Sequence, residues 1–309
     1  VGSRDYHLYA LELSSNGTFE KQWAYKTNGA IVSPPAFSPD GVTAYLSAMD
    51  NRVYALDLTS GDPITDLWVL DSFENGGYVQ SAPVFSNDGK TLYVGSWDNR
   101  LFALNSETMS VKWVAEAGGA VVSSPVLGIG GTLFAGCRDG NVYAIKEDTG
   151  EVVPFLATGG AVVSTPAMSP GGKILFIGSG DQKIYAVSSE TGAIKWEFST
   201  DGAVVASAAC SPAGITVYAT SMDGKLYALT AATGMKKWEF ETGAAVVSSP
   251  AVSPDGIIVY VGSRDKKIYA VAAGTGKMDS PGTWQFETGG SIESSPVVSR
   301  DGGTVFAGS

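Results

Sequence analysis

Few residues of this sequence have the type and spacing that catalysis requires. His7 is the only histidine, so a site that needs two imidazoles is excluded, and a Ser-His-Asp arrangement would depend on a residue in an expected surface hairpin. The two cysteines, Cys137 and Cys210, form neither a CxxC metal pair nor a disulfide framework, and we expect both to be small buried apolar side chains. From these residues we predict no catalytic residue, no metal site and no enzymatic activity.

Aspartates recur along the chain, each four residues before an aromatic residue. Successive aspartates are 45, 48, 41, 42, 42 and 42 positions apart. A ring of carboxylates could bind a cation, but an aspartate that accepts a hydrogen bond from the amide two residues on also stabilises a turn, and we expect this second role. The pairs are Asp5/Tyr9, Asp50/Tyr54, Asp98/Phe102, Asp139/Tyr143, Asp181/Tyr185, Asp223/Tyr227 and Asp265/Tyr269.

Each repeat unit reads as four short strands. In residues 244–286, apolar runs at 246–252, 257–262 and 268–271 and the segment 284–286 are separated by Gly, Pro and Asp turns, and no helical stripe competes with them. Such a meander cannot bury both of its faces alone, so neighbouring units must stack. Seven units of about 44 residues match the period of propeller blades. We predict an all-β protein, a seven-bladed β-propeller of four-stranded antiparallel blades, with residues 1–309 forming a single domain.

Tryptophans stand near the start of the predicted fourth strands. Each is expected to pack beside the alanine of the third strand, since a small residue leaves room for the indole ring, and so to tie the blades together. Phe155 takes this place, offset by one residue, in the remaining unit. These docking residues are Trp23, Trp68, Trp113, Trp196, Trp238 and Trp284, and the alanines are Ala10, Ala55, Ala103, Ala186, Ala228 and Ala270.

The chain begins and ends in the middle of a unit. We expect the closing blade to combine first and second strands from about residues 291–309 with third and fourth strands from about residues 6–25. Pairing the N- and C-terminal strands in one blade would leave no open sheet edge. The bare start and finish also suggest an excerpt from a longer polypeptide.

Composition excludes several kinds of partner. The formal net charge is −11 and no run of Lys and Arg is present, so nucleic acid is a poor partner. No stretch approaches the roughly 18 consecutive apolar residues that a membrane span needs. We expect a monomer. Acidity and few cysteines suit the cytosol and the periplasm equally.

Side chains that vary inside the repeated frame are the candidates for binding. The residue before each loop aspartate varies, and the connections that enter the first strands mostly read Gly-Ala-Val-Val-Ser but depart from this in two units. By blade topology both sets lie on one face, where exposed aromatic residues and arginines are typical contact residues; the alternative is that they are solvated loop tips. The candidates are Arg4, Tyr78, Gln80, Trp97, Arg138, Arg264 and Glu293.

Two segments carry a family resemblance. Ala186…Thr191-Gly192…Trp196 and Ala228…Thr233-Gly234…Trp238 resemble the signature of pyrroloquinoline-quinone-like propeller repeats, and a third copy has Met109 in place of the glycine. The resemblance covers the whole chain. The family includes quinone-dependent alcohol and sugar dehydrogenases, an outer-membrane assembly lipoprotein and non-catalytic sensor or scaffold domains.

The resemblance implies two functional alternatives. The family's dehydrogenases usually have eight blades, a calcium ion held by Glu, Asn and Asp, and often a disulfide between adjacent cysteines, whereas this chain has seven units and no Cys-Cys pair. We therefore predict a non-catalytic scaffold that recognises a protein or a small ligand through one loop face, with no cofactor. The alternative is a dehydrogenase-like domain that binds pyrroloquinoline quinone with calcium. The resemblance also favours a periplasmic or extracellular location.

Overall fold

The computed structural model describes residues 1–14, 18–64, 68–69 and 77–309, and the regular elements among them are all β-strands. The strands form six four-stranded sheets and two two-stranded sheets, and the pairings that are resolved are antiparallel. The predicted all-β fold of four-stranded antiparallel meanders is therefore confirmed.

The residues fall into two compact units. The first comprises Val1–Leu127, Gly131–Asp139 and Tyr143–Val153, and the second comprises Gly128–Gly130, Gly140–Val142 and Pro154–Ser309. The strands wholly in the first unit are β1 (His7–Leu13), β2 (Phe19–Lys26), β3 (Ala36–Phe37), β4 (Thr43–Ala48), β5 (Arg52–Asp57), β6 (Trp68–Val69), β7 (Val84–Phe85), β8 (Thr91–Gly95), β9 (Arg100–Asn105), β10 (Val111–Glu116), β11 (Val126–Leu127) and β12 (Thr132–Gly136). β13 (Asn141–Lys146) and β14 (Val152–Ala157) have residues in both units.

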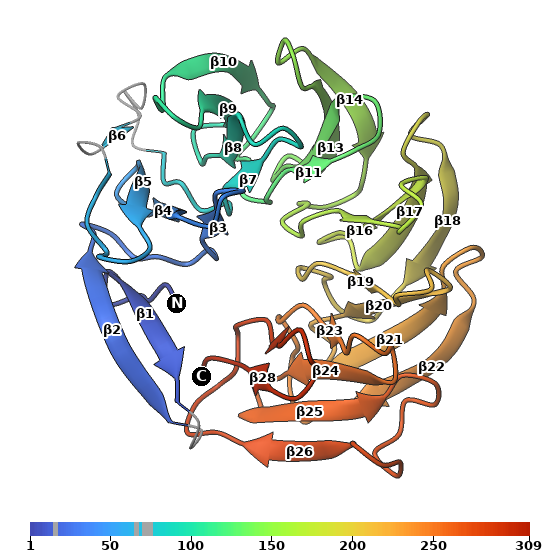
Figure 1. Ribbon diagram of the computed structural model, residues 1–309. Coiled ribbons are helices and arrows are strands. Elements are labelled where there is room, and N and C mark those ends of the chain that lie inside the picture. Colours follow the sequence, from blue (N-terminus) through green and yellow to red (C-terminus); the bar gives the residue numbers. More distant parts are fainter. Residues whose placement is uncertain (15–17, 65–67, 70–76) are drawn as a thin grey trace. The chain divides into compact units, whose positions relative to one another are not determined.

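The second unit contains the remaining strands, and in Figure 1 its strands β23, β24, β25 and β26 lie side by side in sequence order. The other sheets of this unit repeat that order. The strands are β15 (Ala167–Met168), β16 (Ile174–Gly178), β17 (Lys183–Ser188), β18 (Ile194–Ser199), β19 (Ala209–Cys210), β20 (Thr216–Thr220), β21 (Lys225–Thr230), β22 (Lys236–Glu241), β23 (Ala251–Val252), β24 (Ile258–Gly262), β25 (Lys267–Ala272), β26 (Trp284–Glu287), β27 (Val297–Val298) and β28 (Val305–Phe306).

The first strand of each four-stranded sheet is much shorter than its apolar run predicts. The run at 246–252 forms a ladder only at β23, Ala251–Val252. Its earlier amides bond outside the sheet: Val246 donates to the Ser221 carbonyl and Ser249 donates to Ser295 Oγ. Pro250 has no amide hydrogen to donate.

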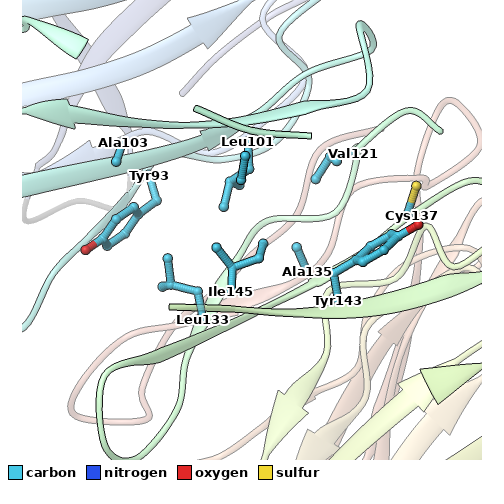
Figure 2. Close-up of a cluster of buried hydrophobic side chains, with 10 residues drawn as sticks. Tyr93, Leu101, Ala103, Val121, Leu133, Ala135, Cys137, Tyr143 and Ile145 are labelled. Atoms are coloured by element: carbon cyan, nitrogen blue, oxygen red, sulfur yellow. The ribbon is translucent and has the colours of Figure 1, made fainter. Parts of the chain in front are cut away.

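Neighbouring sheets pack through apolar side chains, as expected for meanders that cannot bury their faces alone. Figure 2 shows one such cluster in the first unit, where Tyr93 and Leu101 of one sheet face Leu133 and Ile145 of the next. Cys137 belongs to this cluster and is fully buried, whereas Cys210 is half-buried. Both cysteines are free, as expected.

In four of the described joints a tryptophan connects one sheet to the following one. The backbone partner of the indole-bearing residue is the third-strand alanine, as in Ala186–Trp196 and Ala228–Trp238, but the ring itself reaches the turn of the next sheet. Its Nε1 donates to a carbonyl there, from Trp23 to Leu58, Trp113 to Glu147, Trp196 to Ala231 and Trp238 to Ala273, at 2.9–3.0 Å.

Glycine is required at the turn position that contacts the indole ring. A Cβ at Gly234 would lie 2.6 Å from the Trp196 ring, and Gly234 has a φ of +72°, close to the +71 to +77° of its equivalents. Gly61, Gly150 and Gly276 meet Trp23, Trp113 and Trp238 in the same way. This contact gives the Thr-Gly and Trp positions of the repeat a single physical explanation.

One joint differs in its backbone pairing, and the expected packing of the Trp68 ring beside Ala55 stays a prediction. Trp68 pairs with Val53 in β6, while Ile64 donates its amide to the Ala55 carbonyl and so takes the tryptophan's place. The side chain of Trp68 lies outside the described residues. The facing turn has Met109 where the other turns have glycine, at φ 57° and buried in the same core cluster as Ala55.

Closure of a seven-bladed ring stays a prediction, as does the single domain. The half-sheet β1–β2 belongs to the first unit and the half-sheet β27–β28 to the second. Residues 1–3 already flank β1, since the Tyr9 amide donates to the Val1 carbonyl and the Ser3 amide to the His7 carbonyl. Only the part of β1 beyond Tyr9 is therefore open to the pairing that the sequence predicts.

Candidate functional site

The candidate binding residues stand on what we call the loop face: the hairpins between second and third strands, together with the connections that enter the first strands. The two sets of loops are held together by one repeated hydrogen bond. The amide before each loop aspartate donates to the connection, from Met49 to Ala30, Trp97 to Tyr78, Arg138 to Ala120, Gly180 to Ala161, Met222 to Ala203 and Arg264 to Ala245, at 2.9–3.1 Å. The loop face thus presents different side chains from one fixed backbone frame.

The loop aspartates shape the hairpins, as expected from their spacing. Asp181 Oδ1 accepts from the amide of Lys183 two residues on, and Asp181 Oδ2 accepts from the hydroxyl of Tyr185 at 2.6 Å and from the amide of Gly159 at 2.8 Å. Burial opposes ionisation here, but the hydrogen bonds outweigh it and lower the pKa of Asp181. The same Asp–Tyr bond joins Asp5/Tyr9, Asp50/Tyr54, Asp139/Tyr143, Asp223/Tyr227 and Asp265/Tyr269.

Asp98 departs from this pattern. Its third-strand partner is Phe102, which has no hydroxyl, and Asp98 Oδ2 is buried without a hydrogen bond. The side chain is only 7% exposed, and the nearest guanidinium nitrogen, Arg100 Nη1, is 4.0 Å from Oδ2. Burial therefore raises the pKa of Asp98. That Asp98 lacks a hydroxyl partner was visible in the sequence, where Phe102 is the single Phe among the third-strand tyrosines, but its consequence was not predicted.

Trp97, next to Asp98, is the centre of a side-chain cluster that we call the Trp97 cluster: Tyr78, Gln80, Trp97 and Arg138. The indole Nε1 of Trp97 donates to Gln80 Oε1 at 2.8 Å, and Arg138 Cζ lies 4.7 Å from the centroid of the Trp97 ring. Tyr78 is 46% exposed and stands where the equivalent connections have alanine. The structure thus brings together four of the seven predicted binding residues, in the first unit.

The other candidates lie elsewhere. Arg264 and Glu293, both in the second unit, pair with each other, with Arg264 Nη2 2.9 Å and Nε 3.1 Å from Glu293 Oε1. Both side chains are 42% exposed. Arg4 is exposed at the same loop position before β1. A surface ion pair of this kind contributes little to stability, about 0–1 kcal/mol.

The chemical groups of the described residues show no reactive arrangement. No group of three or more His, Cys, Asp or Glu residues that could hold a metal ion occurs in the described ranges. Burial raises the pKa of the Cys137 thiol to about 12 and that of Cys210 to about 11, so neither is a thiolate at neutral pH. His7 Nδ1 lies 2.9 Å from the carbonyl oxygen of Asp5, within its own hairpin.

These residues also do not fit pyrroloquinoline quinone with calcium. Calcium takes six to eight oxygen ligands, commonly from several carboxylates, and the described part of the chain has no such carboxylate group. The described loop aspartates other than Asp98 are engaged by tyrosine hydroxyls of their own hairpins.

No helix among the described residues is long and apolar enough to cross a membrane.

Comparison with known proteins agrees with this architecture. The chain matches the family model described as outer membrane protein assembly factor BamB over residues 49–153 and 138–309. Among solved structures it is similar to the crystal structure of BamB from Moraxella catarrhalis, with a TM-score of 0.77 and 18% sequence identity, covering 99% of this chain and 89% of that one. A search of curated proteins finds no match.

The structural likeness shows a β-propeller fold, and the family match covers most of the chain. The repeated Ala, Thr-Gly and Trp positions have one structural role in both units. The chain therefore belongs to the family of the outer membrane protein assembly factor BamB, the propellers built from pyrroloquinoline-quinone-like repeats.

Proposed function

We propose that this propeller is a non-catalytic recognition module that binds a protein partner through its loop face. The Trp97 cluster is the observation that carries the proposal. Trp97 and Arg138 stand at the variable position before the loop aspartate, which the other units fill with Arg, Met or Gly, and Tyr78 stands where most connections have alanine. The backbone hydrogen bond that holds these loops is the same in the described repeats. Trp, Tyr and Arg are the residues most enriched among the energetically dominant contacts of protein interfaces.

The family supports a protein partner and a location. The matched family is named for the assembly of outer membrane proteins, and the similar Moraxella protein carries the same name. We infer that this chain acts on the periplasmic side of an outer membrane, as a scaffold for other proteins. Cell fractionation tests this location, and recovery with the cytosolic proteins would contradict it.

Site-specific photocrosslinking tests the binding face. A benzophenone amino acid in place of Tyr78 puts a photoreactive group on the loop face at an exposed position. The matched control is Ile194, which is 49% exposed on β18, away from the loop face in the repeat. Each variant is expressed in the cells in which the protein occurs naturally, so that its partner is present. Irradiation should give a protein adduct from position 78 and none from position 194. Equal adduct yields, or adducts from position 194 alone, would refute the proposed face.

A further inference from the structure

We propose that the Trp97 cluster binds an acidic, extended peptide segment of the partner, with an Asp or Glu carboxylate on Arg138 and an apolar side chain against Tyr78 and Trp97. This inference rests on the proposed function and adds the chemistry of the partner. Three observations support the inference: Arg138 is held by contact with Trp97, Arg138 lacks the carboxylate partner that Arg264 has among the described residues, and aromatic side chains lie beside Arg138.

The guanidinium of Arg138 is held in place before any ligand arrives. It lies against the Trp97 ring at 4.7 Å, and that ring is itself fixed by the 2.8 Å hydrogen bond from Nε1 to Gln80. A stacked guanidinium keeps its in-plane N–H donors free, and these match the two oxygens of a carboxylate. Because the side chain is already ordered, binding costs little further conformational entropy.

The repeat shows what an arginine at this position does. Arg264 occupies the equivalent position in the second unit, and Glu293 on the following connection neutralises it at 2.9 Å. Counted from the Gly-Gly pair of the connection, the residue equivalent to Glu293 after Arg138 is Val163. Among the described residues no carboxylate lies within ion-pair distance of Arg138. An external carboxylate therefore fits where the described residues supply none.

The neighbouring acidic groups do not take this role. Asp139 follows Arg138 in the chain, but its Oδ2 accepts from the hydroxyl of Tyr143 at 2.5 Å. Asp98 is buried beneath the loop. The net charge of −11 repels acidic segments at long range, so their selection must come from contact with the cluster itself.

The aromatic side chains supply the second half of the site. Tyr78 exposes 46% of its surface, and its carbonyl accepts the Trp97 amide at 2.9 Å, so the two residues are adjacent. In an extended strand, side chains two positions apart point to the same face, so an acidic and an apolar residue with that spacing can reach Arg138 and Tyr78 together. We therefore expect the peptide to lie extended across the cluster rather than as a helix.

Fluorescence anisotropy with three labelled octapeptides tests the inference. In each probe a Phe stands two positions from an Asp, an Asn or a Lys, so that both side chains point to the same face of the strand, and the Asn peptide is the neutral match of the Asp peptide. The Asp peptide should bind the complete propeller at least ~10-fold more tightly than the Asn peptide. This ratio corresponds to a charge-assisted pair that contributes about 1.4 kcal/mol to binding. Arg138→Ala should abolish this preference, and Arg138→Lys should weaken it because lysine cannot bind a carboxylate in two-point fashion.

Lys195→Ala is the control, since Lys195 is an exposed cation on β18 outside the loop face, and it should leave the preference unchanged. Circular dichroism of each variant establishes that it is folded. Equal binding of the Asn and Asp peptides, a preference that survives Arg138→Ala, a preference for the Lys peptide, or no binding of any peptide would each overturn the inference. If position 78 still crosslinks to a protein in those cases, the proposed function stands and only the acidic-peptide chemistry falls.

Discussion

At the scale of single residues, Phe102 is the departure with the clearest energetic consequence. Six third-strand aromatics are tyrosines, and Phe102 is the seventh. Without the hydroxyl, Asp98 keeps a buried carboxylate oxygen that nothing hydrogen-bonds. A buried polar atom without a partner costs about 1–3 kcal/mol, and more when it is charged. The sheet whose hairpin carries Trp97 is thus also the one that carries this unfavourable carboxylate.

Phe102→Tyr is expected to stabilise the protein. The new hydroxyl should reach Asp98 as Tyr185 reaches Asp181 at 2.6 Å, and a hydrogen bond to a charged acceptor should raise the free energy of unfolding by about 1–2 kcal/mol. Denaturant titration at pH 7 measures the change. The reciprocal variant Tyr227→Phe removes the equivalent bond to Asp223 and should lose a similar amount. A destabilised Phe102→Tyr protein beside a destabilised Tyr227→Phe protein would show that Asp98 is held differently.

The stabilisation by Phe102→Tyr should also depend on pH. Burial raises the pKa of Asp98 above the ordinary value of 3.8, so Asp98 favours the protonated form in the folded state and its contribution to stability falls as the pH rises through that range. The tyrosine hydroxyl favours the ionised carboxylate and lowers this pKa. The difference between variant and wild type should therefore be full at pH 7 and shrink as the pH falls through the raised pKa of Asp98. A difference that does not change between pH 7 and pH 4 would assign the effect to packing alone.

At the scale of strands and turns, the Trp–Gly joint is the main link between neighbouring sheets. Trp196 is 8% exposed, packs in a core cluster with Phe176 and Val217, and donates to the Ala231 carbonyl of the next sheet at 2.9 Å. Trp196→Ala should lower the free energy of unfolding by about 3–5 kcal/mol, from lost burial, the cavity and the orphaned carbonyl. Denaturant unfolding checks this. Ile194→Ala, two residues away but 49% exposed, is the control and should cost much less, so equal losses would contradict the joint.

Ile64 and Met109 stand at two unusual positions of the same joint. Ile64 brings neither a ring nor a side-chain donor to its place beside Ala55. Met109 fills the core from the turn, and the Tyr45 hydroxyl donates to the Ser106 carbonyl at 2.7 Å, the carbonyl equivalent to those that tryptophans bond elsewhere. Met109 fills this core with a backbone φ of 57°, a conformation that favours glycine.

Restoring the usual pair tests whether these two residues share a site. Met109→Gly relieves the backbone but empties the core, and should cost about 1–3 kcal/mol. Ile64→Trp alone should also destabilise, since Met109 leaves no room for the ring. The double variant should lose less unfolding free energy than the two single variants lose together. The coupling in this double-mutant cycle should be about 1–3 kcal/mol. Additive losses would show that the two residues do not share a site.

The strands could be predicted from the sequence because a Gly/Pro/Asp-punctuated repeat specifies them locally. β24, β25 and β26 lie where the alternation of apolar runs and turns put them. The short first strands could not be predicted, because it is a serine of the neighbouring sheet that takes the amide of Ser249. The place of Ile64 beside Ala55 could not be predicted, because Pro63 bridges Leu56 and Ile64 donates to the Ala55 carbonyl, a register that the sequence does not show.

The loop-face residues were predictable as a set but not as contacts. Variation within the repeat marks Arg138 and Arg264 equally. In the structure Arg138 lies on Trp97, whereas Arg264 pairs with Glu293. Which contact each arginine makes depends on side-chain geometry across two loops, and the spacing along the chain does not encode it.

At the scale of the whole molecule, the predicted closing blade has a definite register. In complete sheets the second and third strands pair Leu175 with Val187, Val217 with Leu229 and Val259 with Val271. By the repeat, Val305 is equivalent to the first member of these pairs and Leu11 to the second. Leu11 lies beyond the part of β1 that residues 1–3 flank, so this pairing is compatible with them.

A disulfide tests closure of the ring. With Cys137 and Cys210 replaced by alanine, Leu11→Cys and Val305→Cys should form an intramolecular disulfide on mild oxidation, because antiparallel partners have Cα atoms about 4.5–5.5 Å apart, within the range that a disulfide spans. Faster migration of the monomer on a non-reducing gel detects it. Ile174→Cys with Ser188→Cys, a pair already opposite each other in β16 and β17, is the positive control. If the control pair oxidises while the 11–305 pair stays reduced, the two half-sheets do not form one blade. Disulfide-linked dimers from the 11–305 pair would instead show that a second copy supplies the missing strands. Only the intramolecular product fits a ring of seven blades, since it alone requires β28 and β1 of one chain to be neighbours in the same sheet.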